Sequence, residues 1–362
     1  MYRSNKFEQV KDSMVSQKQA IEEFLASGNS VKIADVAKLA GVSSTTVSRV
    51  LNGQNKLVSK STYRKVERVI GALNYQPGAL GRALRQGQSN LVALFMPDTQ
   101  NPYYSAITDS IEVCLQQDGV SLVLCNTREQ PLVQDAALQL VLSFRIRCIV
   151  MLGAVDSPGL RSAIGGSVPV LFINRAPPEG VVAPFIGIDN RAAGSDVAKH
   201  LHQKGLTRVG AIRGPLGSSA SRLRFEGFRD SMADFGNPID PNHTWLSELT
   251  IQAGYELAQE VLKDSDRPQA IFCANDLIAY GFYRRAEECG VKVPDELLLV
   301  GFDDNPLNRW LAPWLTSVSI PYERFGPVVR AMISGNEGDY AGPVLLDHRI
   351  VERMNTTIGD KQ

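Results

Sequence analysis

The sequence predicts two structural parts, a small all-α head and a larger α/β body of two lobes. Residues 31–75 show the apolar spacing of short helices, whereas short apolar runs alternate with amphipathic stretches from Leu91 onward. The charge divides in the same way. Residues 30–88 hold ten Lys and Arg against two acidic residues, a net charge of +8, and residues 91–362 carry −8. A basic head on an acidic body is expected when only the head meets a polyanion, although a solvated helix face would show the same charge.

The predicted head spans residues 30–76 and contains three short helices. The first carries one apolar stripe at positions i, i+3, i+4 and i+7, formed by Ile33, Val36, Ala37 and Ala40. Gly41 ends this helix, and Ser43 can cap the second. The third begins at Ser59. Three short helices with a glycine turn between the first two predict a helix-turn-helix.

The predicted body spans residues 91–362 and is built from buried strands that alternate with helices. The apolar runs are Leu91–Met96, Ser121–Leu124, Cys148–Met151, Val168–Ile173, Val209–Ile212, Ala270–Cys273 and Leu297–Val300. This pattern is typical of parallel sheets. The body is too long for one such sheet, so we expect lobe 1 over about 91–201 and 319–345 and lobe 2 over about 202–318. Residues 1–29 form an N-terminal extension, which is either a helical arm or the result of a start site placed upstream of Met14.

Several classes of protein are disfavoured by what the sequence lacks. The five cysteines form no CxxC pair and the four histidines have no metal-ligand spacing, so we expect neither a metal nor a cofactor. No export signal or membrane span is recognisable, which favours the cytoplasm. An enzyme is the first alternative, but the sequence contains no GxGxxG after the first strand, no P-loop and no GxSxG elbow. The Gly- and Ser-rich segment Gly214–Ser221 is weak evidence for phosphate binding.

The second helix of the head carries side chains suited to reading DNA. A recognition helix presents short polar or forked side chains from its first turn to base edges. Its first turn here offers Ser44, Thr45 and Thr46, with Arg49 one turn further on. Four side chains stand where phosphate anchors would help: Lys32, Ser59, Lys60 and Thr62.

The head resembles the LacI (lactose repressor) family of transcription regulators. The similarity lies in the run Ile33–Ser43, in Thr46–Asn52 and in Tyr75-Gln76-Pro77, and it continues through landmarks of the body. It implies base reading by Ser44, Thr45 and Arg49 and phosphate contacts by Thr46, Ser48 and Asn52. It also implies a hinge helix and linker over residues 77–90, in which Leu84 wedges into the minor groove and bends the DNA.

The hinge departs from the family pattern at two glycines. Gly78 and Gly81 stand where the family has Asn and Ala, and a glycine inside a helix costs roughly 0.5–1 kcal/mol relative to alanine. We therefore expect Gly81→Ala to tighten the affinity for operator DNA. Titration at fixed salt tests this, and an unchanged or weaker affinity would contradict it.

The body resembles the family's periplasmic-binding-protein-like effector domain. The landmarks are Pro97–Tyr104, Gly187–Asn190, Ser221–Phe228, Asn275-Asp276, Gly301–Asp304 and Leu315-Thr316. Polar groups can converge on a ligand where strands end. The resemblance implies effector contacts by Tyr103, Tyr104, Asp189, Arg224, Asn275 and Asp303. As alternatives, Asp276 and Asp304 cap the following helices and Arg222 forms an ion pair between the lobes.

The expected function is that of a transcription regulator, a repressor, whose affinity for operator DNA depends on a small-molecule effector. Leu249 stands where several relatives stack an aromatic side chain on the effector, so a sugar or sugar derivative is favoured over a purine. A homodimer is expected because a two-fold protein matches a palindromic operator. A solute-binding protein for uptake is the second alternative, but it would need no DNA-binding head.

Overall fold

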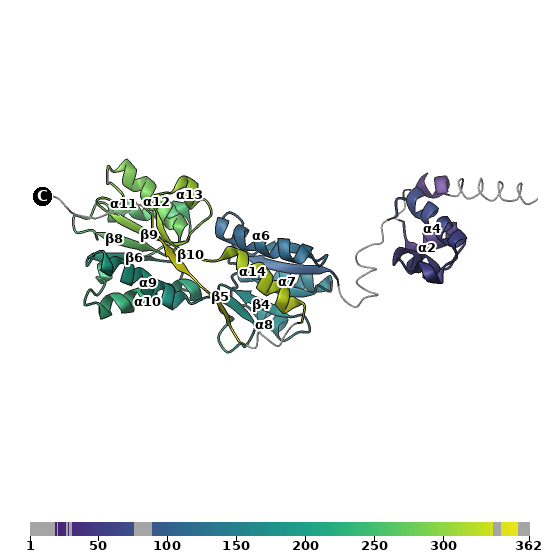
Figure 1. Ribbon diagram of the computed structural model, residues 1–362, viewed down its shortest axis with the longest axis horizontal. Helices are drawn as coiled ribbons and strands as arrows, with labels where there is room; N and C mark the ends of the chain where they lie inside the picture. The colour runs from purple at the N-terminus through teal and green to yellow at the C-terminus, as the bar shows by residue number, and fades with distance from the viewer. Residues whose placement is uncertain are drawn as a thin grey trace, which may run out of the picture. The chain divides into compact units, whose positions relative to one another are not determined.

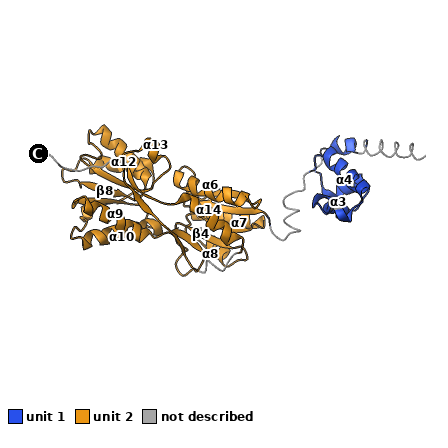
Figure 2. Cartoon of the chain, viewed as in Figure 1, with its two compact units in different colours: residues 1–89 blue, residues 90–362 orange. Residues whose placement is uncertain are grey.

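The chain divides into two compact units, residues 1–89 and 90–362 (Figure 2). A computed structural model of the protein describes residues 19, 21–26, 28, 31–75, 89–335 and 342–353. The predicted hinge, with Pro77, Gly78, Gly81, Leu84 and Arg85, lies outside the described residues.

Three α-helices form the head as the sequence predicts: α2 (Ile33–Ala40), α3 (Ser44–Leu51) and α4 (Lys60–Ala72), with the short 3-10 helix η1 (Asn55–Leu57) between the last two. Gly41 follows α2 with φ of 63°, a left-handed conformation that glycine adopts without steric strain. The predicted apolar stripe is buried at Val36, Ala37 and Ala40. These side chains pack with the inner faces of α3 and α4 in one hydrophobic core.

The N-terminal extension contributes to the same core. Residues 21–26 are helical, Ile21 is only 8% exposed and Phe24 packs against the head's core. The extension thus includes a part of the head's hydrophobic core, which the sequence interpretation of residues 1–29 as an arm or an early start site does not anticipate.

In the described part of the body, two mainly parallel sheets of six strands each are present (Figure 1). The first has the order β11-β5-β4-β3-β1-β2, with strands β1 (Leu91–Met96), β2 (Ser121–Asn126), β3 (Cys148–Met151), β4 (Val170–Ile173), β5 (Phe185–Ile188) and β11 (Val344–Leu346). Helices α6 (Pro102–Gln116) and α14 (Tyr322–Ile333) pack together on one face of this sheet, and α7 (Pro131–Ser143) and α8 (Pro158–Ile164) cover the other.

The second sheet has the order β12-β10-β9-β8-β6-β7, and only the β10–β12 pair is antiparallel. Its strands are β6 (Val209–Arg213), β7 (Thr244–Leu246), β8 (Ala270–Cys273), β9 (Leu298–Asp303), β10 (Thr316–Ser319) and β12 (Arg349–Val351). One face is covered by α9 (Asn190–Gln203) and α10 (Ser219–Asp234), and the other by α11 (Ile251–Val261) and α12 (Asp276–Glu288) (Figure 1). The short helices η2 (Pro241–His243) and α13 (Asn308–Leu311) complete this lobe.

The lobes are divided differently from the prediction at one helix and one strand. Helix α9 packs along α10, so the chain leaves the first lobe between β5 and α9, before the predicted boundary near residue 201. It returns between β10 and α14, and β12 then pairs with β10 in the second sheet. The sequence interpretation does not include this last crossing. The crossing is missing from the prediction because β12 has only three residues, too few to form an apolar run that can be recognised as a strand.

None of the described helices has the length and apolar character that crossing a bilayer requires. The described residues likewise contain no group of three or more His, Cys, Asp or Glu side chains that could hold a metal ion.

Candidate functional sites

The second helix of the head presents a polar face away from its core. Ser43 caps α3, since its side chain accepts a hydrogen bond of 3.2 Å from the Thr46 backbone. Val47 and Val50 are buried in the core. Because these two positions fix the rotation of the helix, Ser44, Thr45 and Arg49 are left exposed to solvent. The three predicted base-reading side chains therefore share an accessible surface.

The predicted phosphate-contacting side chains are held by their neighbours. The Thr46 hydroxyl lies 3.0 Å from the Ser43 hydroxyl. The Asn52 amide donates to Ser48 Oγ at 3.3 Å. Such contacts orient polar side chains at both ends of α3, at the helix surface where a DNA backbone can approach.

Ser59 caps α4, and Thr62 donates to this cap from the first turn of the helix. Ser59 Oγ accepts a hydrogen bond of 3.2 Å from the Thr62 backbone and lies 2.9 Å from the Thr62 hydroxyl. Ser59 is exposed and Thr62 is half-buried. Capping of α4 therefore explains the hydrogen bonds of Ser59 in the free protein. The N-terminus of α4, which Ser59 caps, is also suited to binding a phosphate.

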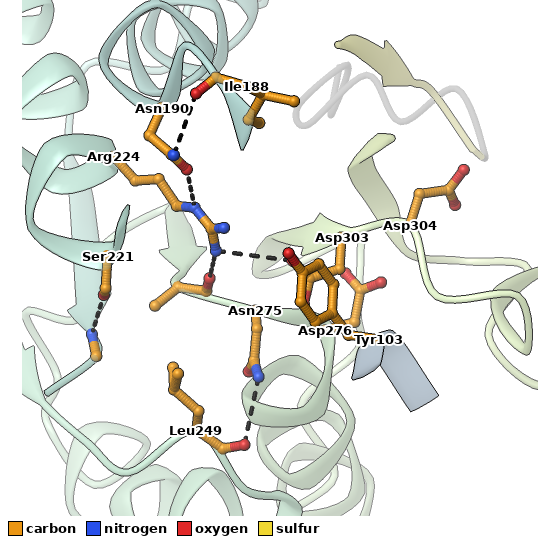
Figure 3. A network of polar contacts seen from close by, with 12 residues as sticks. Tyr103, Ile188, Asn190, Ser221, Arg224, Leu249, Asn275, Asp276, Asp303 and Asp304 are labelled. Carbon is orange, nitrogen blue, oxygen red and sulfur yellow. Dashed lines mark hydrogen bonds and ion pairs between the residues drawn. The ribbon is translucent and has the colours of Figure 1, made fainter. Parts of the chain in front are cut away.

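In the body, Arg224 is the centre of a buried polar network between the two lobes (Figure 3). It stands on α10 and is 6% exposed. Its Nε donates to Asn190 Oδ1 at 2.7 Å, and one terminal nitrogen, Nη1, donates to the Ala274 carbonyl at 2.9 Å. The guanidinium stacks on Phe302, 3.5 Å from the ring centroid. These contacts preset the guanidinium to form forked bonds.

Asp303 faces this guanidinium from the end of β9. The same Nη1 of Arg224 lies 3.7 Å from the Asp303 carboxylate, too far for a hydrogen bond. Asp303 has a left-handed backbone with φ of 100° and is 6% exposed. Burial raises the pKa of its carboxyl to about 8, which Arg224 opposes and Asp276 reinforces. Burial also lowers the pKa of Arg224, so it outweighs the ion pair for both partners.

Five of the six predicted effector contacts line one small cavity between the lobes. Its lining residues are Asn101, Tyr103, Tyr104, Asn174, Arg175, Ser218, Ala220, Ser221, Arg224, Leu249, Asn275 and Asp303. The two tyrosine rings are edge-to-face at 5.0 Å and are both buried, and burial raises their pKa values. Asn275 caps α12 by accepting from the Ile278 backbone at 3.0 Å, and its amide donates to the Leu249 carbonyl at 3.3 Å.

The sixth predicted contact, Asp189, lies elsewhere. Asp189 caps α9, accepting from the Ala192 backbone at 2.9 Å, and is exposed. It lines a neighbouring cavity of about 680 Å³ whose wall is largely apolar, formed by segments that include Pro177, Val181–Phe185, Leu223 and Pro343. The central cavity is far smaller, about 20 Å³, close to the space of one water molecule. A third cavity of about 520 Å³ adjoins it and shares Asn101, Tyr104 and Leu249 with it.

The structure contradicts the alternative roles considered for Asp276, Asp304 and Arg222. Asp276 is not a cap: its carboxylate accepts hydrogen bonds from the Ser317 hydroxyl at 2.6 Å, the Asn305 backbone at 2.7 Å and the Asn308 amide at 2.8 Å. Burial raises the pKa of its carboxyl to about 7. Asp304 pairs with Arg353 at 2.6 Å. Arg222 pairs at 3.0 Å with Glu226 of its own helix.

Sequence interpretation does not single out five polar lining residues of the central cavity: Asn101, Asn174, Arg175, Ser218 and Ser221. A signal for two of them is present, because Asn174 and Arg175 directly follow β4, at the same end of the first sheet as the residues after β1. The remaining three lie in segments that the sequence did single out, Asn101 in Pro97–Tyr104 and Ser218 and Ser221 in Gly214–Ser221, but nothing local shows that these side chains face the cavity.

These observations define a class of protein: a DNA-binding head joined to a two-lobed small-molecule sensor. Comparison with known proteins gives the family. Residues 32–78 match the description of bacterial regulatory proteins of the lacI family, and residues 198–353 match a periplasmic binding protein-like domain. The chain belongs to the LacI family, whose members are DNA-binding transcription regulators and not enzymes.

Individual relatives cover nearly the whole chain. The ribose operon repressor of Escherichia coli K12 is 32% identical over 295 residues, which are 81% of this chain and 88% of the relative. The HTH-type transcriptional repressor PurR of Photorhabdus laumondii is 29% identical over 333 residues, which are 90% of this chain and 97% of the relative. The lac repressor dimer bound to operator and the anti-inducer ONPF superimposes with a TM-score of 0.78 at 26% identity, covering 91% of this chain and all (100%) of that one.

Proposed function

We propose that this protein is a cytoplasmic homodimeric repressor that reads its operator through Ser44, Thr45 and Arg49 and releases or tightens on the DNA when a sugar-like effector enters the cleft around Arg224 and Asp303. The observation that carries the effector site is the buried guanidinium that two fixed acceptors orient toward a cavity between lobes. Clefts between lobes are preferred ligand sites.

The effector class is supported by the cavity wall. Leu249 lines the central cavity and the adjoining one of about 520 Å³. An aliphatic side chain there provides no face on which a planar purine can stack. Hydroxyl groups, by contrast, suit the Asp303 carboxyl and the Arg224 fork. We therefore place sugars and sugar derivatives before nucleobases.

Control of DNA binding is proposed to run through the relative arrangement of the lobes. The chain passes between the lobes at three places, and effector residues lie on both sides of them. An effector that favours one lobe arrangement would change how two heads of a dimer meet the two operator half-sites. The lac repressor structure named above is a dimer on its operator, which supports this assembly. Sedimentation velocity of the full chain should give a dimer, and a stable monomer would contradict it.

The experiment that tests the whole proposal begins with a thermal-shift screen of the full chain against sugars, sugar acids and nucleobases. An operator is first selected from randomised duplex DNA, and its affinity is then measured by fluorescence anisotropy with and without each hit. Arg224→Gln should abolish both the thermal shift and the effect on DNA affinity. Arg222→Gln is the matched control on the same helix, because Arg222 is exposed and pairs only with Glu226 among the described residues.

Two outcomes would overturn parts of this proposal. Selective stabilisation by nucleobases would replace the sugar class. Failure to enrich any DNA sequence, or enrichment unaffected by Arg49→Ala, would contradict the assignment of α3 as the operator-reading helix.

A further inference from the structure

The central cavity has one buried arginine from each lobe in its wall. Arg175 follows β4 of the first lobe and is 4% exposed, and Arg224 stands on α10 of the second lobe and is 6% exposed. Both line the same space of about 20 Å³. Buried arginines are rare unless each donor is matched by an acceptor, so the hydrogen bonds of the two guanidiniums are informative.

Arg175 is incompletely matched. One terminal nitrogen, Nη2, pairs with Glu129, a residue whose side chain is 38% exposed at the mouth of the cleft. Its Nε is buried and has no hydrogen-bond partner among the residues that the structure describes. An unpaired buried donor costs free energy that a partner would recover. Gly153, with φ of 110°, lies next to the Arg175 side chain: a Cβ added at residue 153 would lie 3.9 Å from Arg175 Nε.

Arg224 is incompletely matched as well. Its Nε and Nη1 donate to Asn190 and Ala274, but no hydrogen bond from its other terminal nitrogen, Nη2, is found within the described part of the chain. The carboxylate that faces it stays at 3.7 Å. Burial raises the pKa of Asp303, which weakens its compensation of the guanidinium charge.

The polar side chains between the two arginines offer donors rather than acceptors. Three of their oxygens already accept backbone hydrogen bonds: Asn101 Oδ1 from Tyr103, Ser218 Oγ from Ser221, and Ser221 Oγ from Gly214. Their remaining capacity toward the cavity is mainly amide N–H and hydroxyl O–H. The cavity wall thus has two guanidiniums against one carboxyl, that of Asp303, and this excess of donors is complementary to an anion.

We propose that the effector carries an anionic oxygen group, a carboxylate or a phosphate, which binds in the central cavity between Arg175 and Arg224. This inference rests on the proposed effector site and specifies the class of its ligand. The central volume, close to the space of one water molecule, is too small for a sugar ring and admits an anionic oxygen, while the rest of the head group lies toward the adjoining cavities. The larger cavities that share its lining residues have room for the remainder of the molecule.

The test uses the full chain and two sets of related ligands, each with a neutral parent sugar and its anionic derivatives: glucose, gluconate, glucuronate and glucose 6-phosphate, and ribose, ribonate and ribose 5-phosphate. Binding is measured by thermal shift and isothermal titration at constant ionic strength. We expect a charged member to bind at least tenfold more tightly than its neutral parent. A preference for the acid or for the phosphate ester identifies which anionic group the site takes.

Variants separate a binding role of Arg175 from a structural one. Arg175→Met removes the unpaired donor and leaves Glu129 partly solvated, so the ligand-free protein should be as stable as the parent in urea, while affinity for the charged ligand falls at least tenfold. Arg175→Lys should retain an intermediate affinity. The matched control is Arg161→Gln, an exposed arginine of the same lobe that pairs with Asp156, and it should change neither property.

The outcomes distinguish this inference from the proposed function. If neutral sugars bind as tightly as their acids and Arg175→Met leaves the affinity unchanged, the inference of an anionic effector is wrong. The proposal that the protein senses a sugar would still stand. A marked loss of ligand-free stability in Arg175→Met would assign this arginine to the fold and also overturn the inference. The absence of a shift with every sugar, acid and phosphate would count against both.

Discussion

Replacing Asp303 by Asn should change how the stability of the body depends on pH. The carboxyl has a pKa of about 8 in the folded protein, because burial disfavours its charge, against an ordinary value of 3.8. The unfolded chain therefore loses this proton near pH 4 and the folded chain only near pH 8. The stability associated with the raised pKa is present below the lower value and is lost as the pH rises through the upper one. Asn cannot titrate, so Asp303→Asn removes this loss.

The magnitude follows from the two pKa values. Each pH unit between them lowers the free energy of unfolding of the parent, relative to Asp303→Asn, by about 1.4 kcal/mol. Between pH 5 and pH 8 the free energy of unfolding of Asp303→Asn, relative to that of the parent, should therefore rise by roughly 3–4 kcal/mol. This rise becomes less steep as the pH approaches the pKa of the folded protein. An increase of this size is a large part of the stability of a typical domain.

The assay is urea denaturation followed by tryptophan fluorescence at half-unit pH steps. All three tryptophans, Trp245, Trp310 and Trp314, lie in the body, so the signal in the full chain reports on that unit alone. Titrating groups that do not interact with Asp303 cancel in the difference, whereas Arg224 and Asp276 interact with it and are part of the effect that is measured. Asp266→Asn, at a side chain that is 71% exposed, controls for the loss of one negative charge. A difference between parent and Asp303→Asn that stays constant from pH 5 to pH 8 would refute the raised pKa.

Four further predictions concern other parts of the chain. Ser43→Ala should lower the stability of the head by about 1 kcal/mol, because α3 loses its N-cap bond, and thermal unfolding followed by circular dichroism would show no change if the cap were unimportant. Arg49→Ala should weaken operator affinity by about 1–3 kcal/mol with the fold intact, and equal losses on random DNA would make Arg49 a phosphate contact instead of a base reader. Gly227→Ala should destabilise the body by roughly 1–3 kcal/mol, since the new Cβ would lie 2.0 Å from the Arg191 carbonyl of α9, and a neutral result in urea would show that α9 and α10 can separate freely. Ile21→Ala should destabilise the head by about 2 kcal/mol, whereas the exposed Leu25→Ala should not, and equal effects would contradict packing of residue 21 in the core.

The head could be predicted almost completely because its signals are local. The i, i+3, i+4 stripe, the left-handed Gly41 and the caps Ser43 and Ser59 each act within one helical turn. What sequence reasoning could not anticipate is that Ile21, twelve residues before the first residue of α2, is buried against the helix-turn-helix. A short amphipathic segment has the same pattern whether it packs on a core or lies in solvent.

The body was predicted where strands are continuously apolar over four or more residues and missed elsewhere. All seven apolar runs coincide with strands, and β3, β4 and β8 among them have only four residues. The missed strands either contain a glycine or polar residues, as β5 and β10 do, or have only three residues, as β7, β11 and β12 do. Strand β10 is the clearest case, because Ser317 is fully buried yet polar. Its hydroxyl donates to Asp276, so burial there depends on a carboxylate 41 positions away that no local pattern discloses.

The residues that line the cleft could also be predicted only in part. The family resemblance was enough to bring Arg224, Asn275 and Asp303 together, but not to tell that Asp189 caps its own helix or that Arg175 joins the cavity. Whether an arginine is a ligand contact or a structural ion pair depends on which of its donors remain unmatched, and that depends on distances between elements far apart in sequence. Arg222 and Arg224 are two residues apart on one helix. Arg222 forms a solvent-exposed ion pair with Glu226 of the same helix. Arg224 is buried and contacts Asn190 of α9, Ala274 after β8 and Phe302 of β9. Two positions along α10 therefore separate a surface ion pair from the centre of the proposed sensor, because they place the two side chains on different faces of the helix.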